Sequence, residues 1–429
     1  IGAGLAGLSA ALQAAENGCN VKLVSSLPSE RAQSVMAEGG INAALNTKDE
    51  NDSPEEHFTD TIKAACGLAD PNAVWGMTQA APELVHWLLK LGVKFNMSGY
   101  DDVDLRNFGG QKKKRTAFAQ SDTGKQIMTA MIDAVRRKEA SGMVERFSHH
   151  SFLTLRLCGN ICCGCVIRDE YSQETVELPG DAVIVATGGM HGLFGNTTGS
   201  LSNTGEVTAE LFRLGVPLAN GEMIQYHPTT VKCGGKRMLI SEAARGEGGR
   251  LFAMKDGKQW YFMEEKYPEL GNLMPRDITA REIWKVSHES EVFLDMTEIS
   301  EEIISNKLSG LADDCMTYLH KDIRKEPVSV LPGIHYFMGG ILVDEQHRTP
   351  IQNLCAAGEC CAQYHGANRL GGNSLLGALY GGRVAAKSAC EQADVVDLSC
   401  ATQIDFPPAS QISEIKQLNK VMQETMGVV

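Results

Sequence analysis

The sequence lacks any long hydrophobic run. No stretch of its 429 residues approaches the ~20 apolar residues that a membrane-spanning helix needs, and no signal-peptide pattern opens it. Positive charge is also scarce, with 40 lysine and arginine residues against 53 aspartate and glutamate residues. The net charge of -13 argues against nucleic acid as a partner. We therefore expect no direct membrane span and no nucleic acid partner.

Spacings typical of metal ligands are missing as well. The four residues Cys158, Cys162, Cys163 and Cys165 follow a CxxxCCxC pattern that matches neither zinc nor ferredoxin sites, and no CxxCH haem site exists. Strand alternation would also place Cys162 on the opposite face from Cys163 and Cys165. The 13 cysteines of so long a chain indicate a reducing compartment rather than a disulfide framework. We expect no metal site, and a cytoplasmic or cytoplasm-facing protein.

The length predicts two or three domains, and the composition, 43% hydrophobic and 22% charged, is that of a globular protein. A Gly-x-Gly-x-x-Gly motif opens the chain, with Gly2, Ala3, Gly4 and Ala6 as candidate cofactor contacts, followed by an expected helix over 8–17 and a strand over 21–24. Such glycines let a pyrophosphate approach a helix N-terminus. No acidic residue closes the second strand, where Ser25 stands. Residue 1 falls inside the first strand, so we expect a fragment.

The region 331–382 carries a second set of signals. Two apolar runs, 334–343 and 348–357, are joined by a polar turn, and the second run ends at Gly358-Glu359. A carboxylate at that position can reach a ribose or ribitol hydroxyl. A glycine-rich loop follows, and Asn373 and Ser374 are expected to cap a helix over 375–390 whose N-terminus suits an anion. Taken alone, this loop fits any α/β domain.

In combination these segments resemble the flavoprotein subunits of fumarate reductase and succinate dehydrogenase, with L-aspartate oxidase as a near relative. The shared landmarks are HYFMGG, the Gly-Glu pair and HGANRLGGNS, and the resemblance spans nearly the whole chain. It implies an α/β fold in which a Rossmann-like FAD-binding domain, residues 1–220 and 335–394, is interrupted by an α+β capping domain at 221–334. Residues 395–429 would be a linker and the truncated start of a helical domain.

The resemblance implies FAD as cofactor. In membrane-bound relatives a run similar to residues 30–40 of this chain carries the histidine that links covalently to FAD. This sequence has Gln33 at the matching position, so we expect non-covalent FAD. The further residues expected at the cofactor are Ser34, Glu38, Gly39, Gly40, Thr187, Gly188, Glu206, Glu359 and Leu375.

The substrate motifs of the family follow in order: QYHPT with His227, SEAARGEGG with Ser241, Glu242 and Arg245, and PRD with Arg276. Alone, His227 could be a core histidine and Arg276 a salt-bridged surface residue. We expect Arg369 and His335 to bind one carboxylate of fumarate, and His227 with Ser241 to bind the other. The resemblance implies hydride transfer from N5 of reduced FAD to fumarate, with Arg276 as proton donor and Glu242 and Arg245 as its relay, giving succinate.

Two alternatives remain open. One is an L-aspartate oxidase-like or other enoate-reducing flavoenzyme, although Phe108 stands near the place where the resemblance puts the glutamate that reads the substrate amino group in aspartate oxidases. The other is a non-catalytic FAD-binding electron-transfer subunit. The resemblance implies an iron–sulfur electron-transfer subunit as partner, which could hold the chain peripherally on the cytoplasmic face of the inner membrane. The cluster Lys112–Arg115 is read as a solvated face.

Overall fold

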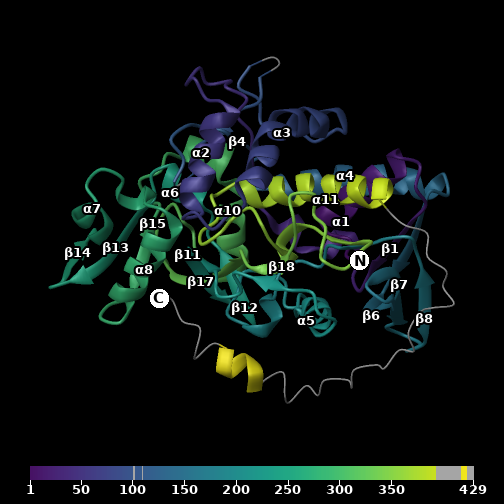
Figure 1. Ribbon diagram of the computed structural model, residues 1–429. Helices are drawn as coiled ribbons and strands as arrows, with labels where there is room; N and C mark the ends of the chain where they lie inside the picture. The colour runs from purple at the N-terminus through teal and green to yellow at the C-terminus, as the bar shows by residue number, and fades with distance from the viewer. Residues whose placement is uncertain (100–101, 109, 393–416, 423–429) are drawn as a thin grey trace.

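The computed structural model describes residues 1–99, 102–108, 110–392 and 417–422 (Figure 1). Its helices are α1 (Leu5–Glu16), α2 (Pro54–Ala64), α3 (Pro71–Lys90), α4 (Thr123–Ala140), α5 (Glu206–Arg213), α6 (Glu242–Gly246), α7 (Phe262–Lys266), α8 (Arg276–Ser287), α9 (Glu301–Lys307), α10 (Ser309–Asp314) and α11 (Asn373–Gln392). Residues 417–422 are also helical.

The strands are short. They are β1 (Val21–Ser25), β2 (Ile41–Asn42), β3 (Leu105–Arg106), β4 (Thr116–Ala117), β5 (Val144–Ser148), β6 (His150–Cys158), β7 (Ile161–Asp169), β8 (Thr175–Pro179), β9 (Val183–Val185), β10 (Leu218–Ala219), β11 (Ile224–Cys233), β12 (Lys236–Leu239), β13 (Arg250–Lys255), β14 (Lys258–Trp260), β15 (Val292–Asp295), β16 (Val328–Ser329), β17 (Leu331–Phe337), β18 (Gly340–Leu342), β19 (Leu354–Ala356) and β20 (Cys361–Ala362).

A parallel β arrangement forms the centre of the nucleotide-binding fold. β1 pairs with β5, and β9 pairs with β19, both in parallel. The first two residues join these pairs: the Gly2 N–H donates to Val24 O at 2.8 Å, and the Ala186 N–H donates to Ile1 O at 2.7 Å. Segments far apart in sequence therefore meet side by side, as a doubly wound sheet requires. The expected α/β class is confirmed by this architecture and by the solved structures compared below.

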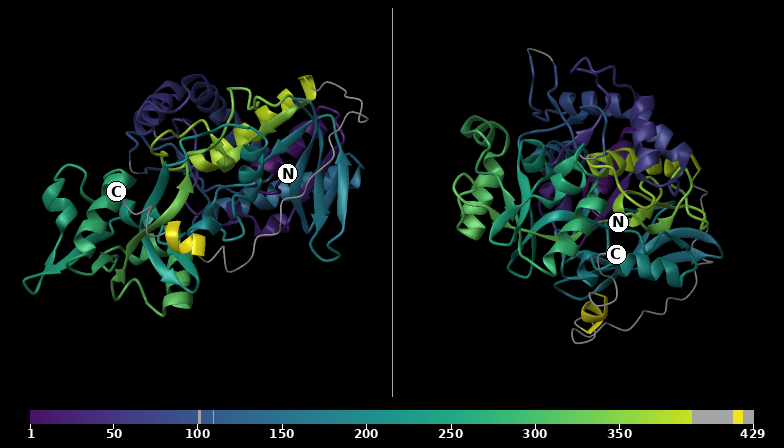
Figure 2. Two further views of the ribbon diagram at one scale, coloured as in Figure 1. Left: turned by 60° about the horizontal axis from the view of Figure 1, so that its bottom comes forward. Right: turned by 90° about the vertical axis from the view of Figure 1, so that its left-hand side faces the viewer.

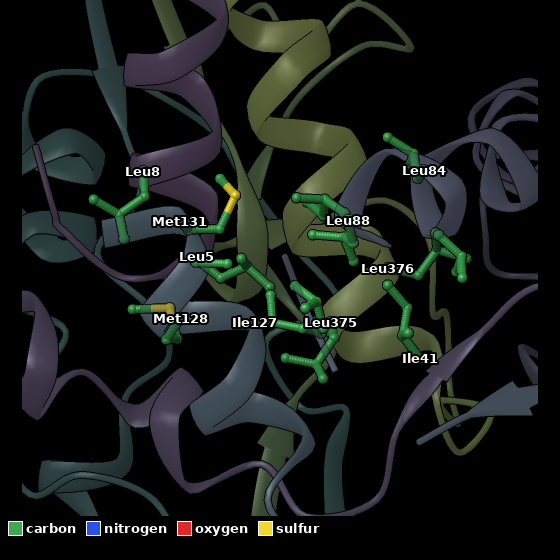
Figure 3. Packing of buried hydrophobic residues seen from close by; sticks show 14 of the residues in the cluster. Leu5, Leu8, Ile41, Leu84, Leu88, Ile127, Met128, Met131, Leu375 and Leu376 are labelled. Atoms are coloured by element: carbon green, nitrogen blue, oxygen red, sulfur yellow. The ribbon is translucent and has the colours of Figure 1, made fainter. Parts of the chain in front are cut away.

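Helices α1 and α11 pack along one another above this sheet (Figure 1). Apolar side chains from α1, α3, α4 and α11 interdigitate in the largest core, as Figure 3 shows for Leu5, Leu88, Met131 and Leu376. Helix α3 starts at Pro71, because the Asp70 carboxylate accepts hydrogen bonds from the Asn72 and Ala73 N–H groups. The N-termini of α1 and α11 both reach the cavity described below, at Leu5 and Ser374.

A second unit carries the four-stranded sheet β14-β13-β15-β16, with its own buried core that includes Leu251, Ile283 and Leu294. It lies at the opposite end of the molecule from the antiparallel sheet β6-β7-β8, as the left view of Figure 2 shows. Between the two ends, the antiparallel pair β11 and β17 leads back toward the nucleotide-binding fold. The domain boundaries at 220, 334 and 394 stay a prediction.

Several expected elements differ in detail. The expected apolar run over 334–343 is divided between two strands, β17 and β18. Helix α11 begins at Asn373 rather than at residue 375, so Asn373 and Ser374 lie inside its first turn and are not caps. Most of the expected linker and helical start at 395–429 lies outside the described residues. No helix in the described part of the chain combines the length and the hydropathy that crossing a membrane would need.

Candidate functional site

A cavity of about 630 Å³ runs from the first residues of the chain to the junction with the second unit. This size falls within the range of roughly 300–1,000 Å³ for ligand and cofactor pockets. Of the residues predicted to contact the cofactor, the following line it: Gly2, Ala3, Gly4, Ala6, Ser25, Ser34, Glu38, Gly39, Gly40, Thr187, Gly188, Glu206, Glu359, Ser374 and Leu375.

Asn373 is the exception among those predictions. Its side chain is buried away from the cavity, where Oδ1 accepts from Asn42 Nδ2 at 2.7 Å and contacts His57 Nε2 at 2.9 Å, and Nδ2 donates to Thr61 Oγ1 at 3.0 Å. The side chain therefore anchors the start of α11 to β2 and α2. Asn373 does not line the cavity, and its expected contact with the cofactor stays a prediction.

The glycine motif forms a backbone cradle at one end of the cavity. Gly2 has φ +103°, and a Cβ there would lie 2.2 Å from Ala186 O, so a side chain is excluded. A Cβ at Gly7 would lie 1.8 Å from Gly2 O, which shows how closely α1 packs on the sheet. Gly4, by contrast, has nothing nearer than Ser34 Oγ at 3.6 Å. The N-terminus of α1 is thus open to a phosphate at Gly4, which fits the pyrophosphate of FAD.

Glu359 lies beside this cradle in the short helical turn Gly358–Cys360. Its Oε1 contacts His191 Nε2 at 3.0 Å and accepts a hydrogen bond from the Phe337 N–H at 3.1 Å. The carboxylate is therefore held in place at the cavity wall. Its second oxygen has no bond to those two groups and can accept from a cofactor hydroxyl, as expected for Glu359.

The run 33–40 forms another wall, and Arg106 braces it. The Arg106 guanidinium donates to Gly39 O at 2.9 Å and to Glu38 O at 3.0 Å, and lies 4.3 Å from the Phe118 ring centroid. The Glu38 carboxyl has no partner for its buried Oε2, and burial, with Asp314 nearby, raises its pKa to about 8. Gln33 lines the cavity in the same run. Arg106 was not among the predicted site residues.

Two predicted histidines meet at the other end of the cavity. The pairing of β11 with β17 brings His227 opposite Gly333, and the His227 and His335 ring centroids lie 5.1 Å apart. Burial, reinforced by nearby arginines, lowers the pKa of both histidines well below the usual value, so both are neutral near pH 7. Thr198 Oγ1 contacts His335 Nδ1 at 2.8 Å. Thr198 is a site residue that no sequence motif had indicated.

Arg276, Glu242 and Arg245 form one connected group. Glu242 Oε2 accepts from Arg276 Nε at 2.9 Å and lies 2.8 Å from Arg276 Nη2, while Glu242 Oε1 lies 3.3 Å from Arg245 Nη2. Arg276 Nη1 also donates to Gln225 Oε1 at 3.2 Å. Arg276 is the first residue of α8 and lines the cavity, whereas Arg245 lies behind Glu242. The structure therefore brings the three predicted residues together, with Arg245 buried behind Glu242, and their role as a proton relay stays a prediction.

Arg369 completes the site from the glycine-rich loop before α11. It is 4% exposed, its Nε has no partner, and its guanidinium lies 4.4 Å from the Tyr336 ring centroid. Burial, together with nearby Arg276, lowers the pKa of Arg369 to about 9. The Gln225 amide donates to Arg369 O at 2.7 Å. Gln225 therefore links Arg276 to the Arg369 backbone, a role that reading QYHPT as a histidine motif missed.

Ser241 caps helix α6 beside this group. Its Oγ accepts a hydrogen bond from the Ala243 N–H at 3.4 Å, which leaves the hydroxyl proton available to a ligand. Phe108 also lines the cavity; a Cβ on Gly39 or on Gly371 would lie 2.9 Å or 3.0 Å from its ring. In the described part of the chain, no group of three or more histidine, cysteine or acidic residues is arranged to hold a metal ion.

Comparisons with known proteins agree with this geometry. The family described as FAD binding domain matches residues 1–375. The Bacillus subtilis succinate dehydrogenase flavoprotein subunit is 44% identical over 408 residues, which cover 93% of this chain and 70% of that protein. A Haemophilus influenzae fumarate reductase flavoprotein subunit is 32% identical, covering 98% of this chain and 72% of its own length.

Solved structures show the same fold. A quinol fumarate reductase variant from E. coli superposes with a TM-score of 0.87 at 28% identity, covering 99% of this chain and 73% of that chain. A Mycobacterium smegmatis Sdh1 structure in complex with UQ1 gives a TM-score of 0.81 at 30% identity, covering 100% of this chain and 76% of that one.

Proposed function

Because the chain belongs to the FAD-binding family of succinate dehydrogenase and fumarate reductase flavoprotein subunits, and is thus an FAD-dependent oxidoreductase, we propose that it reduces fumarate to succinate. The single observation that carries this proposal is the charge at the inner end of the cavity. Three buried guanidinium groups lie there, those of Arg245, Arg276 and Arg369, and the Glu242 carboxylate forms ion pairs with the first two. A buried excess of cations is costly unless an anion compensates it, and a dicarboxylate supplies two negative charges.

The chain's side chains then bind the two ends of the substrate. Arg369, with an unpaired Nε, donates to one carboxylate beside His335. When the Thr198 hydroxyl donates to Nδ1 of His335, the neutral ring keeps its proton on Nε2 and can donate as well. The other carboxylate accepts from the Ser241 hydroxyl and from His227. Fixed donors at both ends hold the alkene in one orientation and exclude water from it.

FAD supplies the hydride chemistry when bound. The remaining proton must come from the protein, and Arg276 is the guanidinium that both lines the cavity and contacts an internal carboxylate. An arginine resists deprotonation, so its proton has to be replaced as it leaves. Glu242, held between Arg276 and Arg245, is placed to return that proton. These assignments rest on position and contact.

Two further features belong to this proposal. Gln33 stands at the cavity wall where the resemblance would place a linking histidine, so the FAD is held by non-covalent contacts only. The lack of a covalent link lowers the reduction potential of the flavin, which favours fumarate reduction over succinate oxidation.

Relatives are named as flavoprotein subunits, and one is a subunit of an 8-methylmenaquinol:fumarate reductase from Wolinella succinogenes. We propose an iron–sulfur subunit as the electron donor, which would hold the chain peripherally at the cytoplasmic face of the membrane.

Turnover of the FAD-loaded protein with chemically reduced viologen tests the function. We expect oxidation of the viologen on addition of fumarate, and slower reduction of a matched dye with succinate. Aspartate with oxygen, and urocanate with viologen, are the competing substrates of the alternative flavoenzyme class. Buried Phe108 argues against an amino-acid substrate, because it offers no carboxylate to an ammonium group. Faster turnover with either competitor than with fumarate would reject the proposal.

A further inference from the structure

Two cysteines from opposite ends of the nucleotide-binding fold meet in space. Cys19 follows α1 and Cys390 lies near the end of α11; they are 371 residues apart in sequence, yet their sulfur atoms are 2.6 Å apart. Both residues are partly exposed. Cys360 and Cys361 also approach each other, with their sulfurs at 3.8 Å, but both are buried. The pair of Cys19 and Cys390 is therefore close together and also accessible to a small reagent.

The backbone holds the two thiols in this position. Gly18 has φ +86° and ends α1, and the Cys19 N–H donates to Ala14 O at 3.0 Å, so the turn that carries Cys19 is fixed to its helix. Small residues let the two helices pack closely: a Cβ on Gly382 would lie 2.3 Å from Ala6 O. The sulfur atoms thus need no rearrangement of the fold to remain neighbours.

Contacts along the two helices show what this pair connects. Ser9 Oγ donates to Leu379 O at 2.7 Å, and further along, Glu16 lies 4.0 Å from Arg383. The contacts advance in the same direction on both helices, so α1 and α11 run parallel. Their N-termini both reach the cofactor cavity, at Leu5 and Ser374. Cys19 and Cys390 join the opposite ends of the same two helices.

We propose that Cys19 and Cys390 are a redox modification site, at which a peroxide converts the two thiols into a reversible disulfide that ties α1 to α11. The sulfurs have to close by only ~0.5 Å to reach the ~2.05 Å of an S–S bond. This would be a covalent link between two helices whose N-termini line the cofactor cavity. It does not depend on the direction of the flavin reaction or on the substrate.

The chemistry balances with a peroxide as oxidant. The Cys19 thiolate attacks one peroxide oxygen, the O–O bond breaks, and the departing oxygen leaves as water, giving a sulfenic acid at Cys19. Cys390 sulfur then attacks the Cys19 sulfur, the S–S bond forms, the S–O bond breaks, and a second water leaves. Two thiols lose two electrons and two protons, and hydrogen peroxide becomes two waters. Burial, with Cys19 adjacent, raises the pKa of Cys390 to about 12, so Cys19 is the residue that attacks first.

Mass spectrometry tests the bond directly. The FAD-loaded protein is treated with a small excess of hydrogen peroxide, remaining thiols are alkylated, and the protein is digested without reductant. We expect a peptide pair joined through Cys19 and Cys390, about 2 Da lighter than the two thiol peptides combined, and its disappearance after dithiothreitol. Cys66, which is exposed and whose thiol contacts Ala64 O, should be found alkylated. Alkylation of both Cys19 and Cys390 after peroxide, or sulfinic acid at Cys19 with Cys390 free, would overturn the proposal.

Thermal unfolding and flavin release give a second readout. A disulfide that closes so long a loop should raise the melting temperature of the oxidised protein by about 5 °C, and slow FAD release, because both helix N-termini hold the cavity. Cys19→Ser and Cys390→Ser should each abolish the shift, whereas Cys66→Ser should keep it. An equal shift in Cys19→Ser would show that peroxide acts elsewhere. If a serine variant fails to load FAD, the wild-type peptide map alone decides.

Discussion

Replacing Arg276 by alanine is the sharpest perturbation of the proposed chemistry. The guanidinium makes three contacts: Nε and Nη2 with Glu242 Oε2 at 2.9 Å and 2.8 Å, and Nη1 with Gln225 Oε1 at 3.2 Å. None of these is with the residues proposed to bind the substrate carboxylates. Arg276→Ala should therefore spare most substrate affinity and remove the proton donor.

The expected size of the effect follows from this separation. Loss of one group that transfers a proton in the transition state commonly reduces turnover by ~10²–10⁴-fold, or about 2.7–5.5 kcal/mol of barrier. The KM for fumarate should change by less than about tenfold, which is the worth of one modest hydrogen bond. Glu242 keeps Arg245 at 3.3 Å, so its charge is still paired after the substitution. Some loss of stability is nonetheless expected, because a buried ion pair is broken.

The assay measures reduced-viologen oxidation by fumarate at matched FAD content. Arg250→Ala is a matched control, because Arg250 also pairs with a glutamate in the same unit: its Nε and Nη2 lie 2.8 Å and 2.6 Å from the Glu264 carboxylate. Unlike Arg276, Arg250 is half-exposed and does not line the cavity. Its turnover should equal that of the wild type. Guanidinium ion added to Arg276→Ala should restore part of the rate by entering the vacated space. Turnover in Arg276→Ala within a few-fold of the wild type would refute Arg276 as donor.

Three other expectations concern neighbouring groups. Arg369→Ala should raise the dissociation constant of succinate by ~10–150-fold, because a charge-assisted hydrogen bond is lost. Titration with succinate, followed by the flavin absorbance, measures this constant. An unchanged constant would show that Arg369 does not bind the substrate. The pKa of Glu38 is raised to about 8, so between about pH 5 and 8 the folded state keeps a proton that the unfolded state releases. The free energy of unfolding should therefore fall as the pH rises through this range, by at most ~1.4 kcal/mol per pH unit. Urea unfolding of Glu38→Gln should lack this pH dependence. Acid precipitation should release all the yellow colour into the supernatant, because Gln33 offers no histidine to the flavin; colour in the pellet would contradict non-covalent FAD.

Much of the fold could be predicted because its signals are local. The glycine motif that starts at Gly2 predicted a strand-to-helix turn, and Gly7 shows the local reason, because a Cβ there would lie 1.8 Å from Gly2 O. Helices α2 and α3 begin where proline follows a capping side chain, at Ser53 and Asp70. Register and caps of this kind depend on neighbours in sequence, so reading the chain was enough.

What could not be predicted depends on partners distant in sequence. Asparagine is a common N-cap residue, but the Asn373 side chain accepts a hydrogen bond from Asn42, 331 residues away. The capping rule considers a side chain and the backbone of its own helix, so it cannot predict a hydrogen-bond partner from another part of the fold. Arg106 was likewise not predicted, since its contacts to Gly39 O and the Phe118 ring arise only after folding. Site residues that brace other site residues carry no motif of their own.

The cavity is built differently at its two ends, and the difference has a physical reason. At the pyrophosphate end, Gly4 leaves space for a phosphate to reach backbone N–H groups, which no substitution of a distant side chain can remove. At the end of the cavity where we propose that the substrate binds, burial lowers the pKa of Arg369 to about 9. A bound dianion would reverse that shift, because an opposite charge favours the charged form. The proposed function therefore predicts that dicarboxylate binding and the protonation of Arg369 are linked, so that Arg369 is most firmly charged when the dianion is bound.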